Sequence, residues 1–240
     1  MNALKLLVSI NEVDEAIDAI KGGADIIDVK NPKEGALGAN FPWIISEVKN
    51  IIGQRAQISA TIGDMPNLPG TASLAALGAA FSGADYIKIG LFGPKSFDEA
   101  LYMMSNVVKS VKGFSSRVKV VAASYADYVE FGGLDPLLLP SIAFKAGAEG
   151  VLIDVKNKGE SNLFNFLNPS QIRLFVNESH KFGLIAALAG KLGKENIVQI
   201  QELGADIIGV RRAVCNNHNF HIGKVQEVLV SDFLKIMKLL

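Results

Sequence analysis

Four ionisable side chains lie in or directly after short apolar segments, where they could act as acids, bases or amine nucleophiles. Asp28 and Lys30 belong to one segment, Lys88 to a second and Asp154 to a third. Strand side chains alternate between two faces, so these residues share one face while β-branched residues occupy the other. Charged side chains are almost never fully buried unless they are paired. We therefore expect the charged face to form the active site.

The same segments carry an internal repeat. A Gly-Ala-Asp or Gly-Ala-Glu triplet introduces each of four apolar segments, and the copies are spaced by about sixty residues. The fourth and sixth positions of every copy, counted from Gly, are β-branched. This spacing predicts a repeated unit of two strand–helix pairs. The copies are residues 23–30, 83–90, 147–154 and 204–211.

A lysine is nucleophilic only when its amine is uncharged. With a reference pKa near 10.4, only about one in a few thousand exposed lysines is neutral at pH 7. Burial beside a second cation lowers that pKa and activates Schiff-base lysines. Lys30 and Lys88 fit this arrangement, and the alternative for either is a buried ion pair with Asp28 or Asp154. The two aspartates are candidate proton shuttles, or they balance the lysine charges.

Strand-length and helix-length segments alternate along the chain. Helical periodicity occurs at 13–21, 71–81, 97–111, 136–145, 170–182 and 195–203, and we assign Trp43 to the core. Eight apolar runs are bounded by turn residues, and they cover residues 4–9, 26–30, 56–62, 86–91, 118–124, 150–155, 184–189 and 207–210.

This alternation predicts a parallel sheet. Eight units in 240 residues fit a closed (β/α)8 TIM barrel that occupies residues 1–240 as a single domain. An open doubly wound sheet is the alternative. It usually has a glycine-rich phosphate turn after its first strand, whereas here Ser9-Ile-Asn-Glu12 follows that strand.

A phosphate site is expected after the last two strands, where such barrels commonly hold phosphate. Gly190 and Lys191 follow the seventh strand, and Gly209 and Arg211 lie at the eighth. Glycine backbone N–H groups and nearby cations suit a phosphate. These four residues are the predicted substrate- and phosphate-binding residues.

Composition excludes several classes of protein. Lys plus Arg equals Asp plus Glu at 24 each, so the chain has no overall electrostatic footprint for nucleic acid. No apolar run approaches the roughly 20 residues of a membrane span, and we expect a cytoplasmic protein without a membrane partner. Cys215 is the only cysteine, which excludes an intramolecular disulfide. His218 and His221 have no evident third ligand, so no metal site is predicted.

The sequence resembles the (5-formylfuran-3-yl)methyl phosphate synthases, also called 4-(hydroxymethyl)-2-furancarboxaldehyde-phosphate synthases. The resemblance covers nearly the whole chain, and its most specific part is the run of residues 28–35. The matching motifs are Asp28-Val-Lys-Asn-Pro-Lys-Glu-Gly35, Leu37-Gly-Ala-Asn-Phe-Pro-Trp43, Ser59-Ala-Thr-Ile-Gly-Asp64, Gly83-Ala-Asp-Tyr-Ile-Lys-Ile-Gly-Leu91, Leu188-Ala-Gly190 and Gly209-Val-Arg211.

The resemblance implies a lyase that needs neither a metal nor another cofactor. It would join two molecules of the phosphorylated triose glyceraldehyde 3-phosphate, with loss of phosphate and water, to make the furan precursor of a methanofuran-type coenzyme. Lys30 would form the Schiff base, with Asp28, Lys88 and Asp154 in support. A further family lysine matches Lys158 by spacing, and Lys156 is a near neighbour.

One position departs from the family pattern. Arg212 replaces the second glycine of Gly-Val-Arg-Gly, where its side chain could crowd the phosphate cradle or add a cation. Two rival functions stay open. One is another phosphate-sugar barrel enzyme, an aldolase, a decarboxylase or an isomerase. Asp28 and Lys30 resemble the start of the Asp-x-Lys-x-x-Asp motif of orotidine monophosphate decarboxylase relatives, although Lys33 stands in place of its second Asp. A non-catalytic phosphometabolite-binding barrel is the other. We also expect a homo-oligomer, because parallel barrels often self-associate.

Overall fold

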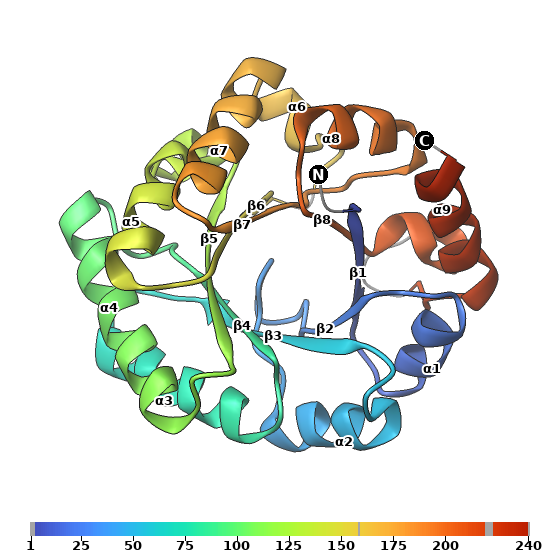
Figure 1. Cartoon of the computed structure of the whole chain (residues 1–240), viewed down its shortest axis with the longest axis horizontal. Coiled ribbons are helices and arrows are strands. Elements are labelled where there is room, and N and C mark those ends of the chain that lie inside the picture. Colours follow the sequence, from blue (N-terminus) through green and yellow to red (C-terminus); the bar gives the residue numbers. More distant parts are fainter. Residues whose placement is uncertain (1–2, 158, 219–222, 240) are drawn as a thin grey trace.

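The chain folds into a closed ring of parallel strands surrounded by helices, seen down the barrel axis in Figure 1. This computed structural model describes residues 3–157, 159–218 and 223–239. Each strand pairs with the next in chain order, and the last pairs with the first. The predicted single-domain (β/α)8 barrel is confirmed, and the open doubly wound sheet is excluded. The strands are β1 (Lys5–Ile10), β2 (Ile26–Val29), β3 (Gln57–Asp64), β4 (Tyr86–Gly90), β5 (Lys119–Tyr125), β6 (Gly150–Asp154), β7 (Ile185–Leu188) and β8 (Ile207–Val210).

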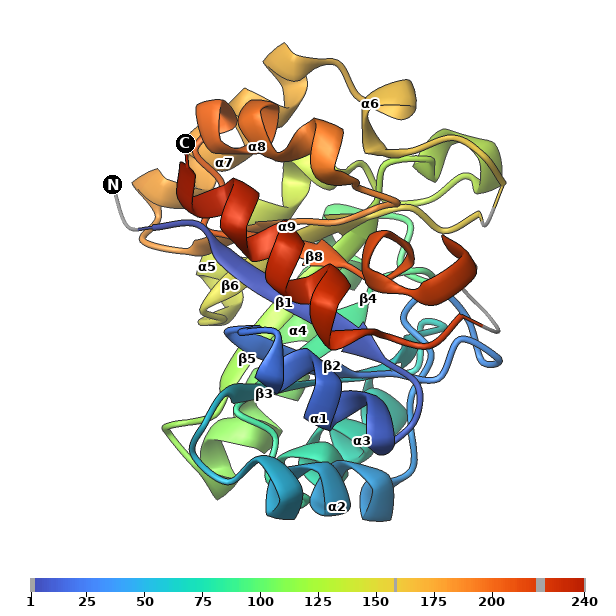
Figure 2. The same ribbon diagram turned by 90° about the vertical axis from the view of Figure 1, so that its right-hand side faces the viewer.

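The helices form the outer layer, and α9 lies beside α1 next to β1 in the side view of Figure 2. The α-helices are α1 (Asp14–Lys21), α2 (Pro42–Ile52), α3 (Pro69–Phe81), α4 (Phe97–Phe114), α5 (Leu139–Ala146), α6 (Leu163–Phe166), α7 (Pro169–Lys181), α8 (Ile197–Leu203) and α9 (Glu227–Leu239). Short 3₁₀ turns are η1 (Tyr128–Phe131), η2 (Pro136–Leu138), η3 (Lys194–Asn196), η4 (Arg212–Val214) and η5 (Asn216–His218).

The prediction for Trp43 is wrong. Its side chain is 63% exposed and stacks on the Phe41 ring, with 4.6 Å between the ring centroids. Trp43 lies in the first turn of α2, directly after Pro42. The buried face of this helix is supplied instead by Ile45, Val48 and Ile52.

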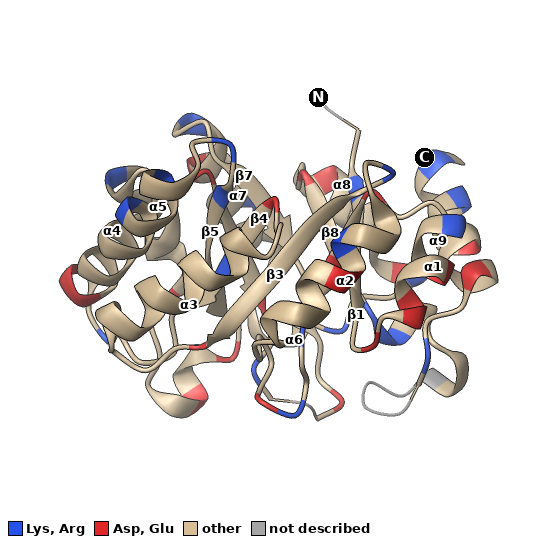
Figure 3. Cartoon of the chain, turned by 90° about the horizontal axis from the view of Figure 1, so that it is seen from below, with Lys and Arg blue, Asp and Glu red and all other residues tan. Residues whose placement is uncertain are grey.

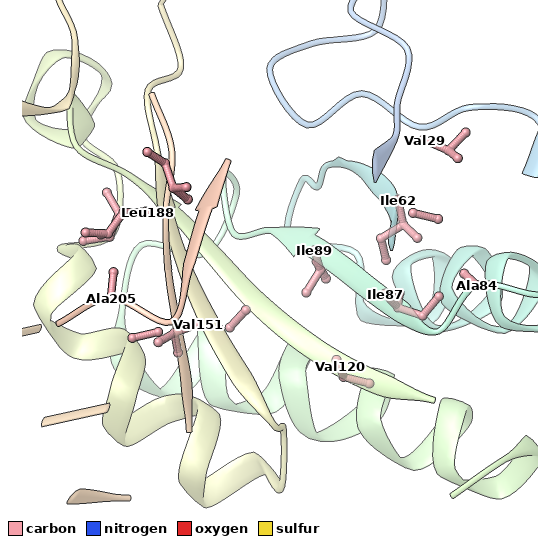
Figure 4. Close-up of a cluster of buried hydrophobic side chains, with 14 of the residues drawn as sticks. Val29, Ile62, Ala84, Ile87, Ile89, Val120, Val151, Leu188 and Ala205 are labelled. Carbon is pink, nitrogen blue, oxygen red and sulfur yellow. The ribbon is translucent and has the colours of Figure 1, made fainter. Parts of the chain in front are cut away.

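Alternation along the strands separates the apolar core from the charged residues. Ile27, Val29, Ile87 and Ile89 point outward into the layer between barrel and helices, where Figure 4 shows several members of this core. Because side chains alternate, the intervening residues point into the barrel. The repeat therefore places its β-branched positions against the helices and its ionisable positions inside.

Charged residues on the rest of the molecule do not gather on one face. In Figure 3, basic and acidic segments are interspersed over the helices and loops. This distribution agrees with the equal numbers of acidic and basic residues in the sequence. The concentration of charge that distinguishes this fold lies inside the barrel.

The acidic residue of each Gly-Ala-Asp or Gly-Ala-Glu triplet joins three strands at the N-terminal end of the barrel. In every copy its N–H donates to a carbonyl of the preceding strand, and its carboxylate accepts the N–H of that same residue at 2.8 Å. Its own carbonyl accepts an N–H at the start of the next odd-numbered strand. We call this fourfold arrangement the acidic clamp. It comprises Asp25 on Leu6, Asp85 on Ile58, Glu149 on Val120 and Asp206 on Ala186.

The glycine of each triplet is required by the conformation of the backbone. Gly23, Gly83, Gly147 and Gly204 have φ between 77° and 98°, a region that other residues rarely adopt. Each glycine follows a helix and turns the chain toward the next strand, as is common at helix C-termini. The repeat thus encodes helix termination, a buried alanine and a strand clamp in three successive residues.

Replacing Asp85 with Ala should lower the free energy of unfolding by about 1–3 kcal/mol, because the buried N–H of Ile58 loses its acceptor. Urea denaturation measures the change. Asp85→Asn is the matched control, since its amide oxygen can still accept this hydrogen bond. A change for Asp85→Ala within about 0.5 kcal/mol, as at ordinary surface positions, would contradict the clamp.

Candidate active site

One cavity of about 280 Å³ lies inside the barrel and opens at the C-terminal ends of the strands. Its deep part is apolar and includes Leu7, Ile26, Val121 and Ile207. Active sites of such barrels lie at this end. Position 158, which carries a predicted catalytic lysine, lies outside the described residues. Every other predicted site residue lines the cavity, namely Asp28, Lys30, Lys88, Asp154, Gly190, Lys191, Gly209 and Arg211.

A buried ion pair joins Asp28 on β2 to Lys88 on β4. Lys88 Nζ lies 2.8 Å from Asp28 Oδ2, and the two side chains are 6% and 1% exposed. The hydroxyl of Ser9, the neighbour of Asp28 on β1, donates to the same oxygen at 3.0 Å. Burial opposes the charge on Asp28, but the ammonium groups of Lys88 and Lys30 outweigh it and hold the pKa of this carboxyl below its usual value. Asp28 is therefore a carboxylate at neutral pH.

The second carboxylate oxygen of Asp28 has different surroundings. Among the described residues, Asp28 Oδ1 and Ser59 Oγ are buried and lack a hydrogen-bond partner of normal geometry, although the Ser59 hydroxyl is close enough to help lower the pKa of Asp28. Asp28 and Ser59 are direct neighbours on β2 and β3, and both line the cavity. Buried polar atoms are normally satisfied. Asp28 and Ser59 thus form a buried polar pair in the wall of the cavity.

Lys30 lies at the C-terminal end of β2, where its side chain enters the cavity and the residue is only 5% exposed. Its Nζ donates to Ala36 O at 3.4 Å, so the loop of residues 31–41 covers the amine. The backbone carbonyl of Lys30 also has a partner, because the side-chain amide of Asn40 donates a hydrogen bond to it at 3.3 Å. The amine is therefore buried beneath the covering loop, and it is close enough to Asp28 for its charge to help lower the pKa of that carboxyl.

Asp154 occupies the end of β6 and is 7% exposed. Its Oδ1 accepts the N–H of Val155 at 2.7 Å, which fixes the carboxylate at the cavity wall. It stands in the same cavity as Lys30 and Lys88. Asp154 thus lines the cavity, and its role as a proton shuttle stays a prediction.

Arg211 has a well-defined structural contact that the sequence did not indicate. Its guanidinium binds the buried Glu15 of α1 through two nitrogens, at 3.1 and 3.0 Å, and also donates to Ser9 O and Gly223 O. Glu15 in turn accepts N–H groups from Asn11 and Val225. This bidentate pair ties the end of β8 to α1. Phosphate binding by Arg211 stays a prediction.

The loop after β7 is shaped by Gly190 and Lys191. Both have positive φ, 102° and 56°, and a Cβ at Gly190 would lie 2.7 Å from a methyl group of Val155. Lys191 Nζ donates to the carbonyls of Gly159 and Ser161 in the loop after β6. Lys191 therefore links two loops at the cavity rim, and its contact with phosphate stays a prediction.

Arg212, the departure from the family pattern, also lines the cavity. Its guanidinium lies 3.9 Å from Glu160, and its side chain is 40% exposed. It therefore adds a cation at the mouth of the site. Gly209, three residues earlier, packs so that a Cβ there would meet that of Ala189 at 3.1 Å.

Lys156 is absent from the residues that line the cavity. Its Nζ lies 3.3 Å from Asp64 Oδ2 and 5.0 Å from the centroid of the Phe92 ring. The backbone N–H groups of Lys156 and Asn157 both donate to the buried Asp127 at 2.8 Å. These contacts anchor the loop after β6 and direct the Lys156 ammonium toward Asp64.

Other kinds of site find no support in the described chain. Within residues 3–157, 159–218 and 223–239, no three His, Cys, Asp or Glu side chains are grouped so that they could hold a metal ion, and His221 lies outside these ranges. Burial raises the pKa of Cys215 to about 11, so a thiolate nucleophile is not available at neutral pH. None of the described helices is long and apolar enough to cross a bilayer.

The fold and the cavity define a (β/α)8-barrel protein with a buried lysine–carboxylate site at the C-terminal ends of its strands. Residues 6–233 match the family model described as 4-HFC-P synthase. Two proteins named (5-formylfuran-3-yl)methyl phosphate synthase are close relatives. The Methanocaldococcus jannaschii protein is 48% identical, covering 97% of this chain and 99% of its own. The Methanosarcina barkeri protein is 50% identical, covering 88% and 91%. The chain belongs to the 4-HFC-P synthase family and is an enzyme.

Solved structures show the same barrel at low sequence identity. KGPDC from Streptococcus mutans has a TM-score of 0.67 at 11% identity, with 99% of this chain and 98% of that chain covered. A 3-hexulose-6-phosphate synthase has a TM-score of 0.64 at 16% identity, with 98% and 99% covered. These similarities establish the fold.

Replacing Asp28 with Asn should leave Lys88 without its buried counter-charge and destabilise the protein by about 3–5 kcal/mol at neutral pH. The pKa of Asp28 is lower in the folded chain than in the unfolded one. Its contribution is therefore fully present above the unfolded pKa, about 4, and is lost as the pH falls through the folded value.

Urea denaturation of both proteins at a series of pH values measures this difference. The gap in unfolding free energy should be constant from about pH 5 to 8 and shrink below about pH 4. Asp232→Asn removes an exposed pair with Lys235 and should change stability by no more than about 0.5 kcal/mol. A gap that persists undiminished at pH 3 would show that Asp28 is not the titrating partner.

Proposed function

We propose that this enzyme condenses two molecules of glyceraldehyde 3-phosphate into (5-formylfuran-3-yl)methyl phosphate, through a Schiff base on Lys30. The observation that carries the proposal is a buried amine inside a cavity that also contains a carboxylate and a second ammonium group. The names of the relatives supply the product. By atom balance, two trioses yield this product, one phosphate and two molecules of water. The product would serve as the furan precursor of a methanofuran-type coenzyme.

Schiff-base chemistry accounts for the residues that surround Lys30. Lys30 would first lose the proton of its ammonium group, a loss that the charge of Lys88 favours. The neutral amine would then attack the triose aldehyde, and loss of water from the carbinolamine would leave an iminium ion. The iminium withdraws electrons, so that a general base can remove the proton from the neighbouring carbon. Asp28 lines the cavity, and its lowered pKa keeps it a carboxylate, so we assign this base role to it.

The resulting enamine expels the phosphate that is β to the iminium carbon, which leaves an enol whose terminal carbon is nucleophilic. The branched skeleton of the product requires this carbon to attack the middle carbon of the second triose, whose carbonyl group must first move there by isomerisation. We assign to Asp154, which is held at the end of β6, the exchange of protons with the oxygens that leave as water. We assign Lys88 the task of balancing the charge of Asp28, and Lys158 a supporting role by its family match.

Phosphate binding is the second part of the proposal. The rim of the cavity near β7 and β8 includes Gly190, Lys191, Gly209, Arg211 and Arg212. We propose that backbone N–H groups at the two glycines, with Lys191 and Arg212, bind the phosphate that is retained in the product. Arg211 would contribute mainly by holding the β8 loop through Glu15.

Reductive trapping tests the nucleophile. Incubation with glyceraldehyde 3-phosphate and cyanoborohydride should add the reduced triose phosphate to Lys30, because the reagent converts an iminium ion to a stable amine. Peptide mass spectrometry locates the modified lysine. Lys30→Arg should give no adduct there and no furan product.

Lys119→Arg is the matched control, since Lys119 is a barrel lysine at the start of β5 that does not line the cavity. It should be trapped at Lys30 as efficiently as the unaltered chain. Furan product without any adduct, or an adduct only at another lysine, would overturn Lys30 as the nucleophile. Saturable binding of the triose phosphate with neither adduct nor product would favour a binding protein.

A further inference from the structure

Asp64, at the end of β3, is a nearly buried carboxylate that does not line the cavity. Its side chain is 7% exposed and receives donors from three directions. The N–H groups of Ala36 and Leu37 lie 2.9 and 3.1 Å from its oxygens. The Tyr125 hydroxyl donates to Oδ1, and Lys156 Nζ is 3.3 Å from Oδ2. Asp64 is therefore a junction between loops.

The loop of residues 31–41 connects this junction to the amine of Lys30. The N–H of Ala36 donates a hydrogen bond to Asp64, and the carbonyl of Ala36 accepts one from Lys30 Nζ. One residue thus contacts both the junction and the proposed nucleophile. A second bond from β3 holds the same loop, since Thr61 Oγ1 donates to Gly38 O at 2.7 Å. The position of the loop over the amine is consequently set by β3.

Two glycines leave the space that the junction needs. Gly35 has a φ of 134°, and a Cβ there would overlap the Asp64 carboxylate. A Cβ at Gly90 would overlap the Tyr125 hydroxyl. The loop backbone and the phenol can approach Asp64 this closely because neither glycine has a side chain.

The groups around Asp64 all act as donors toward its carboxylate. Burial, followed by the charge of Asp64, raises the pKa of Tyr125 well above its usual value. The phenol therefore keeps its proton and acts as a donor. Lys156 supplies the positive charge that balances the carboxylate, and its own backbone N–H is held by Asp127. All four groups that contact Asp64 are therefore donors, and each contact requires Asp64 to be the acceptor.

We propose that Asp64 is a positioning residue, which ties the loop over Lys30 to the loop after β6 and so holds Lys30 in the geometry needed for iminium formation. This inference rests on the proposed function of Lys30. Asp64 is not among the residues that line the cavity, so its effect on the reaction passes through the loop. Displacement of a reacting group by about 1 Å can cost roughly 100-fold in rate.

Asp64→Asn is the test variant, because it keeps the size of the side chain but directs an amide NH₂ at groups that are all donors. Asp85→Asn is the matched control, since Asp85 also accepts a backbone N–H and pairs with a lysine, at the opposite end of the barrel. Both variants are compared with the unaltered chain as folded proteins. Two quantities are measured, namely hydrogen exchange in residues 31–41 and the single-turnover rate of cyanoborohydride trapping by glyceraldehyde 3-phosphate.

Asp64→Asn should speed exchange in residues 31–41 by at least about 10-fold and slow trapping by roughly 10- to 100-fold. The adduct should still form on Lys30. Asp85→Asn should change neither quantity. Trapping at the normal rate in Asp64→Asn, whether or not exchange changes, would overturn the positioning role. An equal slowing in Asp85→Asn would do the same, because it would point to general destabilisation.

Tyr125→Phe provides an independent test if Asp64→Asn does not fold. It removes one donor and keeps the carboxylate with its other contacts, so trapping should slow by a smaller factor and still exceed the change in Asp85→Asn. Unaltered trapping in Tyr125→Phe would then count against the proposal. If the unaltered chain gives no adduct at all, the proposed reaction fails, and exchange in residues 31–41 alone decides whether Asp64 anchors the loop.

Discussion

A carboxylate and two ammonium groups share the interior of a barrel whose floor is apolar, and the site depends on how their charges are balanced. Asp28 is buried, so water cannot stabilise its charge, but Lys88 at 2.8 Å and Ser9 at 3.0 Å satisfy one of its oxygens. The neighbouring Ser59 adds a further contact to the same carboxylate, which lines the cavity. Removal of either partner would leave an uncompensated buried charge, which is far more costly than an exposed one. The same pair therefore serves the stability of the barrel and the chemistry proposed for Lys30.

The two ends of the barrel have separate tasks. At the N-terminal end, the acidic clamp joins successive strands through carboxylates that accept backbone N–H groups. At the C-terminal end, the residues that follow the strands surround the cavity and vary in chemistry. Asp25, directly before β2, and Asp28, within β2, show the division, since the first clamps β1 and the second lines the cavity. This separation allows the catalytic end to contain strained and charged groups, because the opposite end secures the strands.

The loops around the cavity are held by charged groups that bind protein oxygens and N–H groups. Arg211 and Glu15 join β8 to α1, while Asp127 and Asp64 anchor the loop after β6. Lys191 adds contacts to the carbonyls of Gly159 and Ser161. Several cations that the sequence alone assigns to substrate are thus engaged by the protein itself. Their charge still contributes to the potential at the rim, where phosphorylated substrates would enter.

Strand and helix order, the closed barrel and the alternation of Ile27 and Asp28 between its two faces follow from local periodicity, which depends only on backbone geometry and on the burial of apolar side chains. The sequence by itself also determined the family, because the run from Asp28 to Gly35 and the other motifs are specific. Local patterns could not show that Arg211 pairs with Glu15 or that Asp64 joins two loops, since the partners lie far apart in the chain. The exposure of Trp43 depends instead on which face of α2 packs on the barrel, and Ile45, Val48 and Ile52 supply that face. Closure of the barrel brings Glu15 and Arg211 together across 196 positions of sequence. Only the tertiary structure decided these pairings, because a buried charge is stabilised by whichever group the fold places within a few ångströms of it.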